Sequence, residues 1–416
     1  MSSPPCGSHF SLSIVCLARD LIVHTGISFR AAAAALALIA QRWQLPLAIP
    51  SFTTIRSWIV RLGRYALCRP LDATVAWVWM IDHTVQIGNQ KLFVILGCPL
   101  AEVPLARRCL GLSDLQLVAL VVMKSSTQEL VAIELENATE RTGVPRLIVS
   151  DHAGDVKKGV EQFQKQHPQT AYVHDVAHYG ANVLENRWER DPRWHEFLSQ
   201  LKQTNLKLRQ TEHAYLLSPA LRPKARFMNV WVLLRFAGRV LRLLDGPTPN
   251  ARVQEQYGWL QGYRQELLDW LEQHRLVQTT IDHVRRYGLN ATTPSELEEA
   301  WGTLSERPGT KMVAGYLRVY ARKYGSQARA GETLVGSTDA LESSFGKLKR
   351  LEGEASGGGF TGMVLALGAL TGEADESTVQ AALENVPTKK AEGWVKRTLG
   401  TTMRWLRRKV LGGENV

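Results

Sequence analysis

Three nearly continuous apolar runs follow one another in the first third of the chain, and they constrain its fold more than any other feature. They are TVAWVWMI at 74–81, KLFVILGC at 91–98 and LQLVALVVMK at 115–124. Short apolar runs rich in Val, Ile and Trp are typical of strands that are buried on both faces of a sheet. The sequence therefore predicts three consecutive strands at the centre of an α/β domain.

Strands and helices alternate after the third run. Residues 127–143 have helical spacing, RLIVSD at 146–151 is a short strand, residues 155–167 are a helix, and TAYVHDVA at 170–177 is a fifth strand. Three sequential strands predict a meander, and the later alternation predicts strands added in parallel to the same sheet. We expect one mixed sheet.

A helical unit is predicted before this sheet, over residues 11–68. Ser28 and Ser51 are placed to cap two of its helices. The last helix, FTTIRSWIVRLGRY, carries Arg56, Arg61 and Arg64 away from its apolar face. A helical unit that ends in a polar, arginine-bearing helix is similar to a helix-turn-helix, which places its second helix in the major groove of DNA. A small packing or oligomerisation bundle is the alternative.

A chain of 416 residues is expected to contain two or three folded units. In chain order we predict an N-terminal helical DNA-binding unit at 1–70, the first part of the sheet core at 71–184, an all-helical insertion at 185–330, the completion of the core at 331–375 and a basic C-terminal tail at 376–416. The tail contains Lys389, Lys390, Lys396, Arg397, Arg404, Arg407, Arg408 and Lys409.

The charge balance favours an acidic partner. The formal net charge is +11 and the isoelectric point is about 9.5. An excess of cations attracts a polyanion such as nucleic acid, although a basic protein without such a partner is the alternative. The five cysteines are scattered and odd in number, which favours a reducing, cytoplasmic compartment over a disulfide framework. Since no stretch approaches the roughly 20 apolar residues of a membrane span, we expect no membrane partner.

Two aspartates stand at the ends of predicted strands. Asp82 follows the first run in WMIDHT, and Asp151 follows the fourth in LIVSDH. If these strands are neighbours, both carboxylates meet at one edge of the sheet. Carboxylate oxygens are ligands that Mg²⁺ prefers, and two such ions roughly 4 Å apart can act on both oxygens of a phosphodiester exchange. The alternative is that each aspartate only caps the turn after its strand.

A third acid is available late in the chain. In GSTDALESSFGKLKR, Ser337 or Thr338 can cap a helix that holds Glu342 about one turn in. Cations follow Glu342 on the same helix, where a phosphate backbone could bind, and they are Lys347, Lys349 and Arg350. A solvated helix acid without a role in chemistry is the alternative reading of Glu342.

The segments WVWMIDHT, LIVSDHAGD and STDALESSFGKLK together resemble the DDE transposases of the RNase H-like superfamily. In that family the first acid lies on the first strand, the second just after the fourth, and the third on a late helix. The last segment is similar to the L-E-S-x-F-G-K-x-K pattern of bacterial insertion-sequence transposases. The 191 positions between Asp151 and Glu342 (342 − 151) imply a helical insertion in the core, which residues 185–330 fit.

The resemblance implies a function. Metal-dependent cleavage at transposon ends would be followed by attack of the freed 3′-OH on target DNA, with no covalent enzyme–DNA intermediate. Asp82, Asp151 and Glu342 would be the catalytic residues and would hold two Mg²⁺ or Mn²⁺ ions. The partners would be double-stranded DNA, at the transposon ends and the target, and further copies of the chain in a homodimer or higher oligomer. A catalytically inactive DNA-binding derivative and another RNase H-fold nuclease are the alternatives.

Two further features have open interpretations. His174 and His178 flank Asp175, and HDVAH is similar to the C/D-x-x-H motif of hAT and Mutator-like transposases, in which Asp175 and His178 would be supporting residues. A histidine metal pair, or a strand-end acid with a helix-capping or packing histidine, would explain the same residues. The predicted insertion also holds several tryptophans that either stack on an extruded base or form core, namely Trp188, Trp194, Trp231, Trp259, Trp270 and Trp301.

Overall fold

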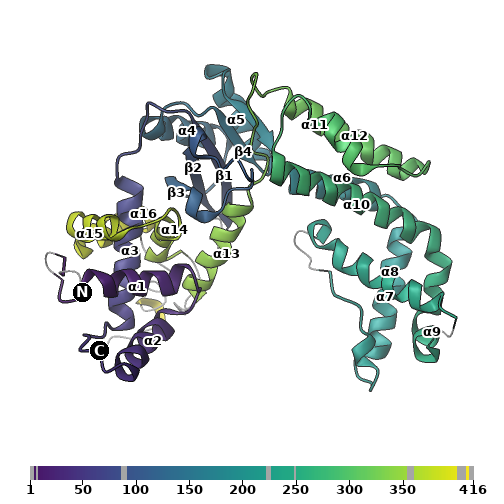
Figure 1. The fold of residues 1–416 in the computed structure, drawn as a ribbon, viewed down its shortest axis with the longest axis horizontal. Coiled ribbons are helices and arrows are strands. Elements are labelled where there is room, and N and C mark those ends of the chain that lie inside the picture. The colour runs from purple at the N-terminus through teal and green to yellow at the C-terminus, as the bar shows by residue number, and fades with distance from the viewer. Residues whose placement is uncertain are drawn as a thin grey trace. The chain divides into compact units, whose positions relative to one another are not determined.

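The computed structural model describes the chain except for residues 1–3, 6–7, 86–90, 222–225, 248–249, 354–359, 401–408 and 412–416. The chain divides into two compact units (Figure 1). Unit 1 contains Met1–Leu105, Leu110–Tyr172 and Thr338–Val416, and unit 2 contains Ala106–Cys109 and Val173–Ser337. Within the described ranges, no helix has the length and apolar character that crossing a membrane requires.

The described part of the chain contains one sheet of five strands. The strands are β1 (Trp77–Val85), β2 (Lys91–Pro99), β3 (Gln116–Met123), β4 (Leu147–Ser150) and β5 (Ala171–His174). Their order is β3-β2-β1-β4-β5, with β1, β2 and β3 antiparallel and β4 parallel to β1. This is the strand order of an RNase H-like sheet, so the predicted α/β fold with a mixed sheet is confirmed.

The two faces of the sheet have different coverings. On one face Trp79, Ile81 and Ile148 form a buried core with side chains of α4 (Gln128–Thr142) and α5 (Gly154–Gln166). Successive side chains of a strand point to opposite faces, so the residues that alternate with Trp79, Ile81 and Ile148 along β1 and β4 point to the other face. On β1 the second face meets α13 (Asp339–Gly353).

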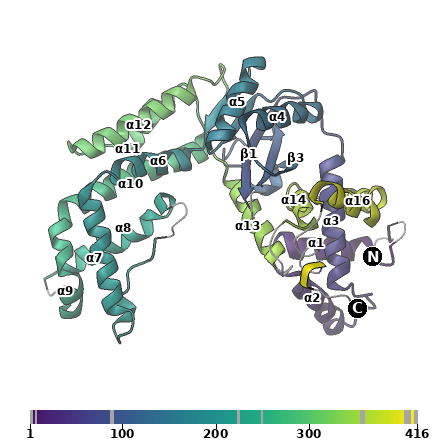
Figure 2. The same cartoon turned by 180° about the vertical axis from the view of Figure 1, so that it is seen from behind.

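Helices from both ends of the chain pack together within unit 1 (Figure 2). Ser28 and Ser51 cap α2 (Phe29–Arg42) and α3 (Phe52–Cys68) by accepting N–H groups at 3.1 Å, as predicted. Gly63 on α3 and Gly368 on α14 (Ala366–Leu370) allow close approach, since a Cβ on Gly63 would lie 1.6 Å from the Leu365 carbonyl oxygen. The helices of this group are α1 (Leu12–Val23), α2 (Phe29–Arg42), α3 (Phe52–Cys68), α14 (Ala366–Leu370), α15 (Glu376–Asn385) and α16 (Thr388–Leu399).

Unit 2 is helical in its described part, apart from the end of β5 and an isolated bridge between Leu289 and Leu334. Its core is aromatic: the rings of Trp188, Trp194 and Trp270 pack together, and Trp188 and Trp194 are 4.9 Å apart. The predicted helical insertion is therefore confirmed. Its helices are α6 (Val176–Trp188), α7 (Pro192–Leu208), α8 (Val230–Leu244), α9 (Ala251–Tyr257), α10 (Arg264–Tyr287), α11 (Thr293–Trp301) and α12 (Pro308–Gly325).

Short 3₁₀ turns connect the longer elements in both units. They are η1 (Leu100–Glu102), η2 (Leu112–Asp114), η3 (Ala214–Leu216), η4 (Arg226–Met228), η5 (Gly258–Tyr263) and η6 (Gly362–Leu365).

Candidate active site

Asp82 lies inside β1, three residues before the strand ends at Val85. The sequence placed it at the end of the strand, and the difference arises because the antiparallel pairing with β2 continues as far as Val85 and Lys91. Asp82 is half-buried, and its Oδ1 accepts the N–H of His83 at 2.6 Å. The backbone thus helps to orient this carboxylate.

Asp151 directly follows β4, the strand that lies parallel to β1. Met80 pairs with Val149, so extending this register by two residues places Asp82 level with Asp151. Neighbouring strands lie about 4.8 Å apart, and residues at matching positions point to the same face. That face is the one opposite α4 and α5. If the register continues past Val149, the two carboxylates meet where β4 ends, and their closeness stays a prediction.

The turn after Asp151 is held by several interactions. Asp151 Oδ1 accepts the N–H of Ala153 at 2.9 Å, and Ser150 Oγ accepts the N–H of His152 at 3.1 Å. Ser150 Oγ also shares a hydrogen bond with the Tyr172 hydroxyl at 2.7 Å. His152 has a φ of 59°, a left-handed conformation that is uncommon for residues other than glycine. The chain therefore changes direction sharply just beyond the carboxylate.

Glu342 lies in the first turn of α13 and is exposed. The helix packs against β1 within the same unit, and Asp339 shares its first turn. Among the described residues, which include these acids, no three His, Cys, Asp or Glu side chains are gathered closely enough to hold one metal ion. Carboxylate oxygens suit a divalent ion by donor chemistry, and metal binding by Asp82, Asp151 and Glu342 stays a prediction.

A polar cluster that we did not predict from the sequence occupies the other face of the sheet. His83 Nε2 lies 3.1 Å from Ser126 Oγ, and Lys91 Nζ donates to Asp155 Oδ2 at 3.1 Å. Burial lowers the pKa of His83 to about 4, so the ring is neutral at pH 7. Burial alone would raise the pKa of Asp155, but hydrogen bonds from Ser126 and Lys91 outweigh it and lower the pKa to about 2.

This cluster had a weak signal in the sequence. His83 follows Asp82 directly and so points to the opposite face, and Asp155 comes four residues after Asp151 in the first turn of α5. Lys91 and Ser126 have no recognisable pattern around them, since only the folded sheet brings them to His83 and Asp155. We name His83, Lys91, Ser126 and Asp155 the bracing cluster.

Comparisons with known proteins add little to this geometry. No protein-family model matches the chain, and no curated protein matches it in sequence. Among solved structures, one similar chain comes from the Drosophila P element transposase strand transfer complex, with a TM-score of 0.43 and 11% identity over 91% of this chain and 94% of that chain. A likeness this weak assigns no family.

The cations of α13 are turned partly toward the protein. Lys347 Nζ donates to the Val23 carbonyl oxygen at 3.0 Å, and the Arg350 guanidinium donates to the Gly26 carbonyl oxygen at 3.2 Å. Burial lowers the pKa of Lys347 below its usual value. Lys349 is exposed. In this structure Lys347 and Arg350 therefore hold the α1–α2 turn, and DNA binding by these three residues stays a prediction.

The arginines of α3 differ from one another in exposure and in hydrogen bonding. Arg61 donates from Nε to the Val386 carbonyl oxygen at 2.7 Å and from a second nitrogen to that of Leu383. Arg56 is exposed, and Arg64 is half-buried. In the tail, Arg404, Arg407 and Arg408 lie outside the described residues. DNA binding by Arg56, Arg61 and Arg64 also stays a prediction.

Asp175 caps helix α6 in unit 2. Its carboxylate accepts the N–H of His178 at 2.8 Å, and the residue is only 2% exposed. The preceding His174 is buried, and its carbonyl oxygen accepts the Tyr320 hydroxyl at 2.8 Å. The acid, and not a histidine, therefore caps the helix, and a supporting role in catalysis for Asp175 and His178 stays a prediction.

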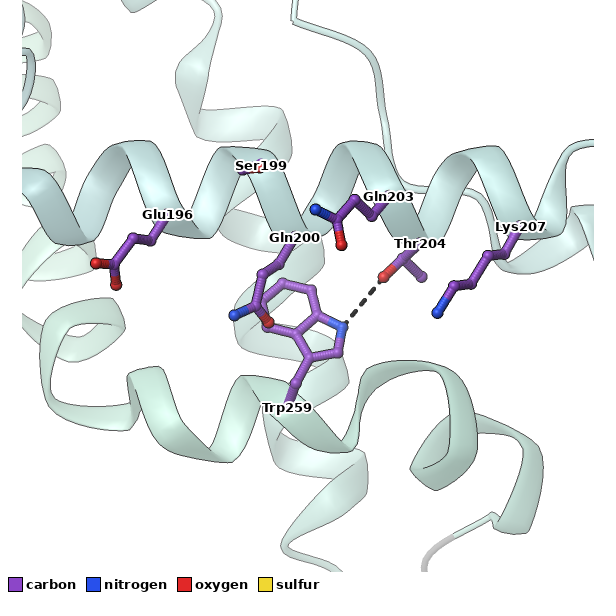
Figure 3. A pocket seen from close by; sticks show the side chains of 7 residues that line it. All are labelled: Glu196, Ser199, Gln200, Gln203, Thr204, Lys207 and Trp259. Carbon is purple, nitrogen blue, oxygen red and sulfur yellow. Dashed lines mark hydrogen bonds between the residues drawn. The ribbon is translucent and has the colours of Figure 1, made fainter.

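Two of the six tryptophans named above reach the surface of unit 2. Trp188, Trp194, Trp270 and Trp301 are core residues, whereas Trp231 is 41% exposed. Trp259 is half-buried and lines a hollow of about 430 Å³ along α7 (Figure 3). Its indole N–H donates to Thr204 Oγ1 at 3.2 Å, which ties the ring to α7. A stacking role stays a prediction, and it is now confined to Trp231 and Trp259.

Proposed function

We propose that this protein is a DNA transposase that cleaves strands at transposon ends and transfers the freed 3′-OH into target DNA. The observation that supports the proposal is the parallel pairing of β1 with β4, whose register would align Asp82 with Asp151 if it continued two residues past Val149. The resemblance of the segments around Asp82, Asp151 and Glu342 to DDE transposases supports it. The net positive charge of the chain fits a DNA substrate.

In this proposal the three acids are the ligands of the reaction centre. Asp82 and Asp151 bind from adjacent strands, each oriented through a hydrogen bond from a backbone N–H group. Glu342 approaches from the first turn of α13, a helix that packs on β1. Two Mg²⁺ or Mn²⁺ ions, when bound, stabilise the charge on the attacking and leaving oxygens of the phosphodiester.

The bracing cluster supports the acids and is not itself a metal ligand. The Lys91–Asp155 ion pair joins β2 to the first turn of α5, and that helix begins three residues after Asp151. His83 and Ser126 join the end of β1 to the segment before α4. These contacts hold the strand ends that carry Asp82 and Asp151, so the cluster positions the acids and does not contact DNA.

The proposal is tested with DNA that carries the sequences flanking the gene for this protein. The purified chain is incubated with that DNA and a target plasmid in Mg²⁺ or Mn²⁺, and products are sequenced across each junction. We expect nicks with 3′-OH ends and joined products. Binding without cutting would instead indicate an inactive DNA-binding protein, and cutting without joining would indicate a nuclease.

The identity of the third acid is tested separately. Glu342→Gln should abolish cleavage, while Asp339→Asn, in the same turn of α13, serves as the matched control and should retain most activity. Both variants should bind DNA as the wild type does. Loss of cleavage in Asp339→Asn with an active Glu342→Gln would move the third ligand to Asp339 and contradict the assignment of Glu342.

A further inference from the structure

Helix α8, in unit 2 (Figure 1), has one apolar face and one cationic face. Arg235, Arg239 and Arg242 are exposed, on the side away from the core. Because they are four and then three residues apart, the helix places them in one row, with rises of about 6 Å and about 4.5 Å between them. The buried side of α8 is apolar throughout and consists of Val230, Leu233, Leu234, Ala237, Val240, Leu241 and Leu244. The geometry of a single helix therefore brings the three cations together.

The three guanidinium groups have few contacts with the described part of the chain. None of them forms an ion pair there, and Arg242 Nε makes one long hydrogen bond, to the Gly238 carbonyl oxygen of its own helix, at 3.3 Å. The guanidinium carbon of Arg235 lies 5.4 Å from the centre of the Trp231 ring, one turn earlier. Like charges at these spacings destabilise a helix. The row thus lowers the stability of α8, and no acid within the described residues compensates for it.

The acids of the elements that pack against α8 do not neutralise this row. Asp245, at the C-terminal end of α8, is paired with Arg264. Helices α9 and α10 and turns η4 and η5 contact α8, and together they contain six arginines and five acids, a net charge of +1. Helix α7 lines a hollow with Leu233 of α8 and contains three cations and one acid, and helix α6 lines a hollow with Trp231 and contains one of each. The surroundings of the row are therefore neutral to positive.

We propose that Arg235, Arg239 and Arg242 form a phosphate-binding row, the α8 arginine row, that binds the backbone of duplex DNA. The proposal deepens the proposed function by giving unit 2 a part in holding the substrate, and it rests on that function for the identity of the DNA. Arginine suits phosphate well, because its planar guanidinium can donate two parallel hydrogen bonds to phosphate oxygens. Contacts of this kind supply affinity and fix the position of the duplex without reading its base sequence.

The distribution of charge on α8 favours DNA over an acidic protein as the partner. Protein interfaces have an apolar centre in which charged residues are depleted, and their charges lie at the rim. On α8 the order is reversed: the arginines occupy the middle of the exposed face, and the exposed apolar side chains, Trp231, Val232 and Leu243, lie toward its two ends. A row of cations with no acid among them matches the row of phosphates along a DNA strand.

The test measures binding of a fluorescent DNA duplex by anisotropy in EDTA, so that no metal-dependent cleavage occurs. Arg235→Gln/Arg239→Gln/Arg242→Gln should weaken binding by at least about tenfold at about 0.1 M salt, and the slope of log K against log salt should become shallower by roughly 3. The corresponding triple lysine variant keeps the charge and should retain the slope. The matched control, Lys311→Gln/Arg322→Gln/Lys323→Gln, removes three exposed cations from α12 and should change affinity by less than about threefold. Thermal melts should show all three variants folded.

An unchanged affinity and salt slope in the triple glutamine variant of α8 would overturn the proposal, and the row would then serve a partner other than DNA. An equal loss in the α12 control would overturn it as well. Because the assay contains no metal ion, its outcome is independent of the chemistry. If the α8 variant loses binding although the wild type never cleaves DNA, the row stands and the proposed function fails. If the wild type cleaves DNA and the α8 variant binds it normally, the function stands and the row fails.

Discussion

Near the end of β1 the two faces of the five-stranded sheet carry different polar groups: acids on one face and a paired polar cluster on the other. Asp82 points to the face that meets α13, and the next residue, His83, points to the face covered by α4 and α5. On the first face are carboxylates oriented by backbone N–H groups. On the second is the bracing cluster, in which Lys91 pairs with Asp155 and the neutral His83 lies beside Ser126. Candidate reactive groups and the groups that support them thus alternate along one strand.

The largest effect is expected on the face of the carboxylates. Asp82→Asn or Asp151→Asn should lower the rate of strand cleavage by more than about a hundredfold, because even partners one step removed from a metal ion cost up to that much. The free energy of unfolding should change by less than about 1 kcal/mol, as is usual for substitutions that leave the core intact. Cleavage kinetics and urea unfolding measure the two quantities.

A smaller effect is expected on the face of the bracing cluster. Asp155→Asn or Lys91→Met should slow cleavage only roughly tenfold, since these residues act through the strands that carry the acids. Should either substitution abolish cleavage as completely as Asp82→Asn, with the fold intact, the distinction between the two faces would be wrong. Glu161→Gln, at an exposed position on α5, is the matched control and should cleave normally.

The same cluster predicts a pH dependence of stability. The pKa of Asp155 is lowered to about 2 in the folded protein, below the value of about 3.9 in an unfolded chain. The ionised carboxylate therefore stabilises the fold above about pH 4, and this contribution is lost as the pH falls toward 2. With allowance for solvent screening we expect about 1 kcal/mol. Wild type and Asp155→Asn should differ in urea unfolding at pH 7 and converge near pH 2.

Arg61 on α3 holds the end of α15 through hydrogen bonds to two carbonyl groups. Arg61→Gln should lower the free energy of unfolding by about 1 kcal/mol, because carbonyl groups at the end of α15 lose their donor. A thermal melt of the variant beside Arg56→Gln, which should melt like the wild type, checks this. An unchanged melting temperature in Arg61→Gln would show that the brace contributes nothing.

The smallest effect is expected at His152, in the turn beside Asp151. A left-handed conformation costs a residue with a Cβ about 1 kcal/mol, which glycine avoids, but glycine also loses more entropy on folding. His152→Gly should therefore change the free energy of unfolding by less than about 1 kcal/mol. A larger loss would mean that the contact of its ring with Tyr172, at 4.3 Å, matters more than the backbone.

Much of the fold was predictable from local patterns. The apolar runs at 91–98 and 115–124 match β2 and β3 to within one residue at each end, and Ser28 and Ser51 cap their helices as predicted. These features depend on residues close together in the chain. Asp82 was placed at a strand end because the apolar run stops there, whereas pairing with β2 carries the strand on to Val85.

What the sequence could not show depends on contacts over long separations. Lys91 reaches Asp155, Arg61 reaches Val386, and Lys347 reaches Val23, and no local pattern marks any of these pairs. For this reason cations that look alike in the sequence divide into internal braces and exposed groups only in the folded chain. Likewise, Glu342 is far from β1 in the sequence, and only the packing of α13 on β1 brings its helix to the sheet.

The most direct test of the paired aspartates is an exchange of ligand and metal. A thiolate is a softer ligand than a carboxylate and binds Mg²⁺ poorly, while Mn²⁺ accepts it better. Asp82→Cys and Asp151→Cys should therefore lose strand cleavage in Mg²⁺ and recover a measurable part of it in Mn²⁺, relative to the wild type in each metal. Equal activity relative to the wild type in both metals, whether high or absent, would contradict metal binding by these two residues.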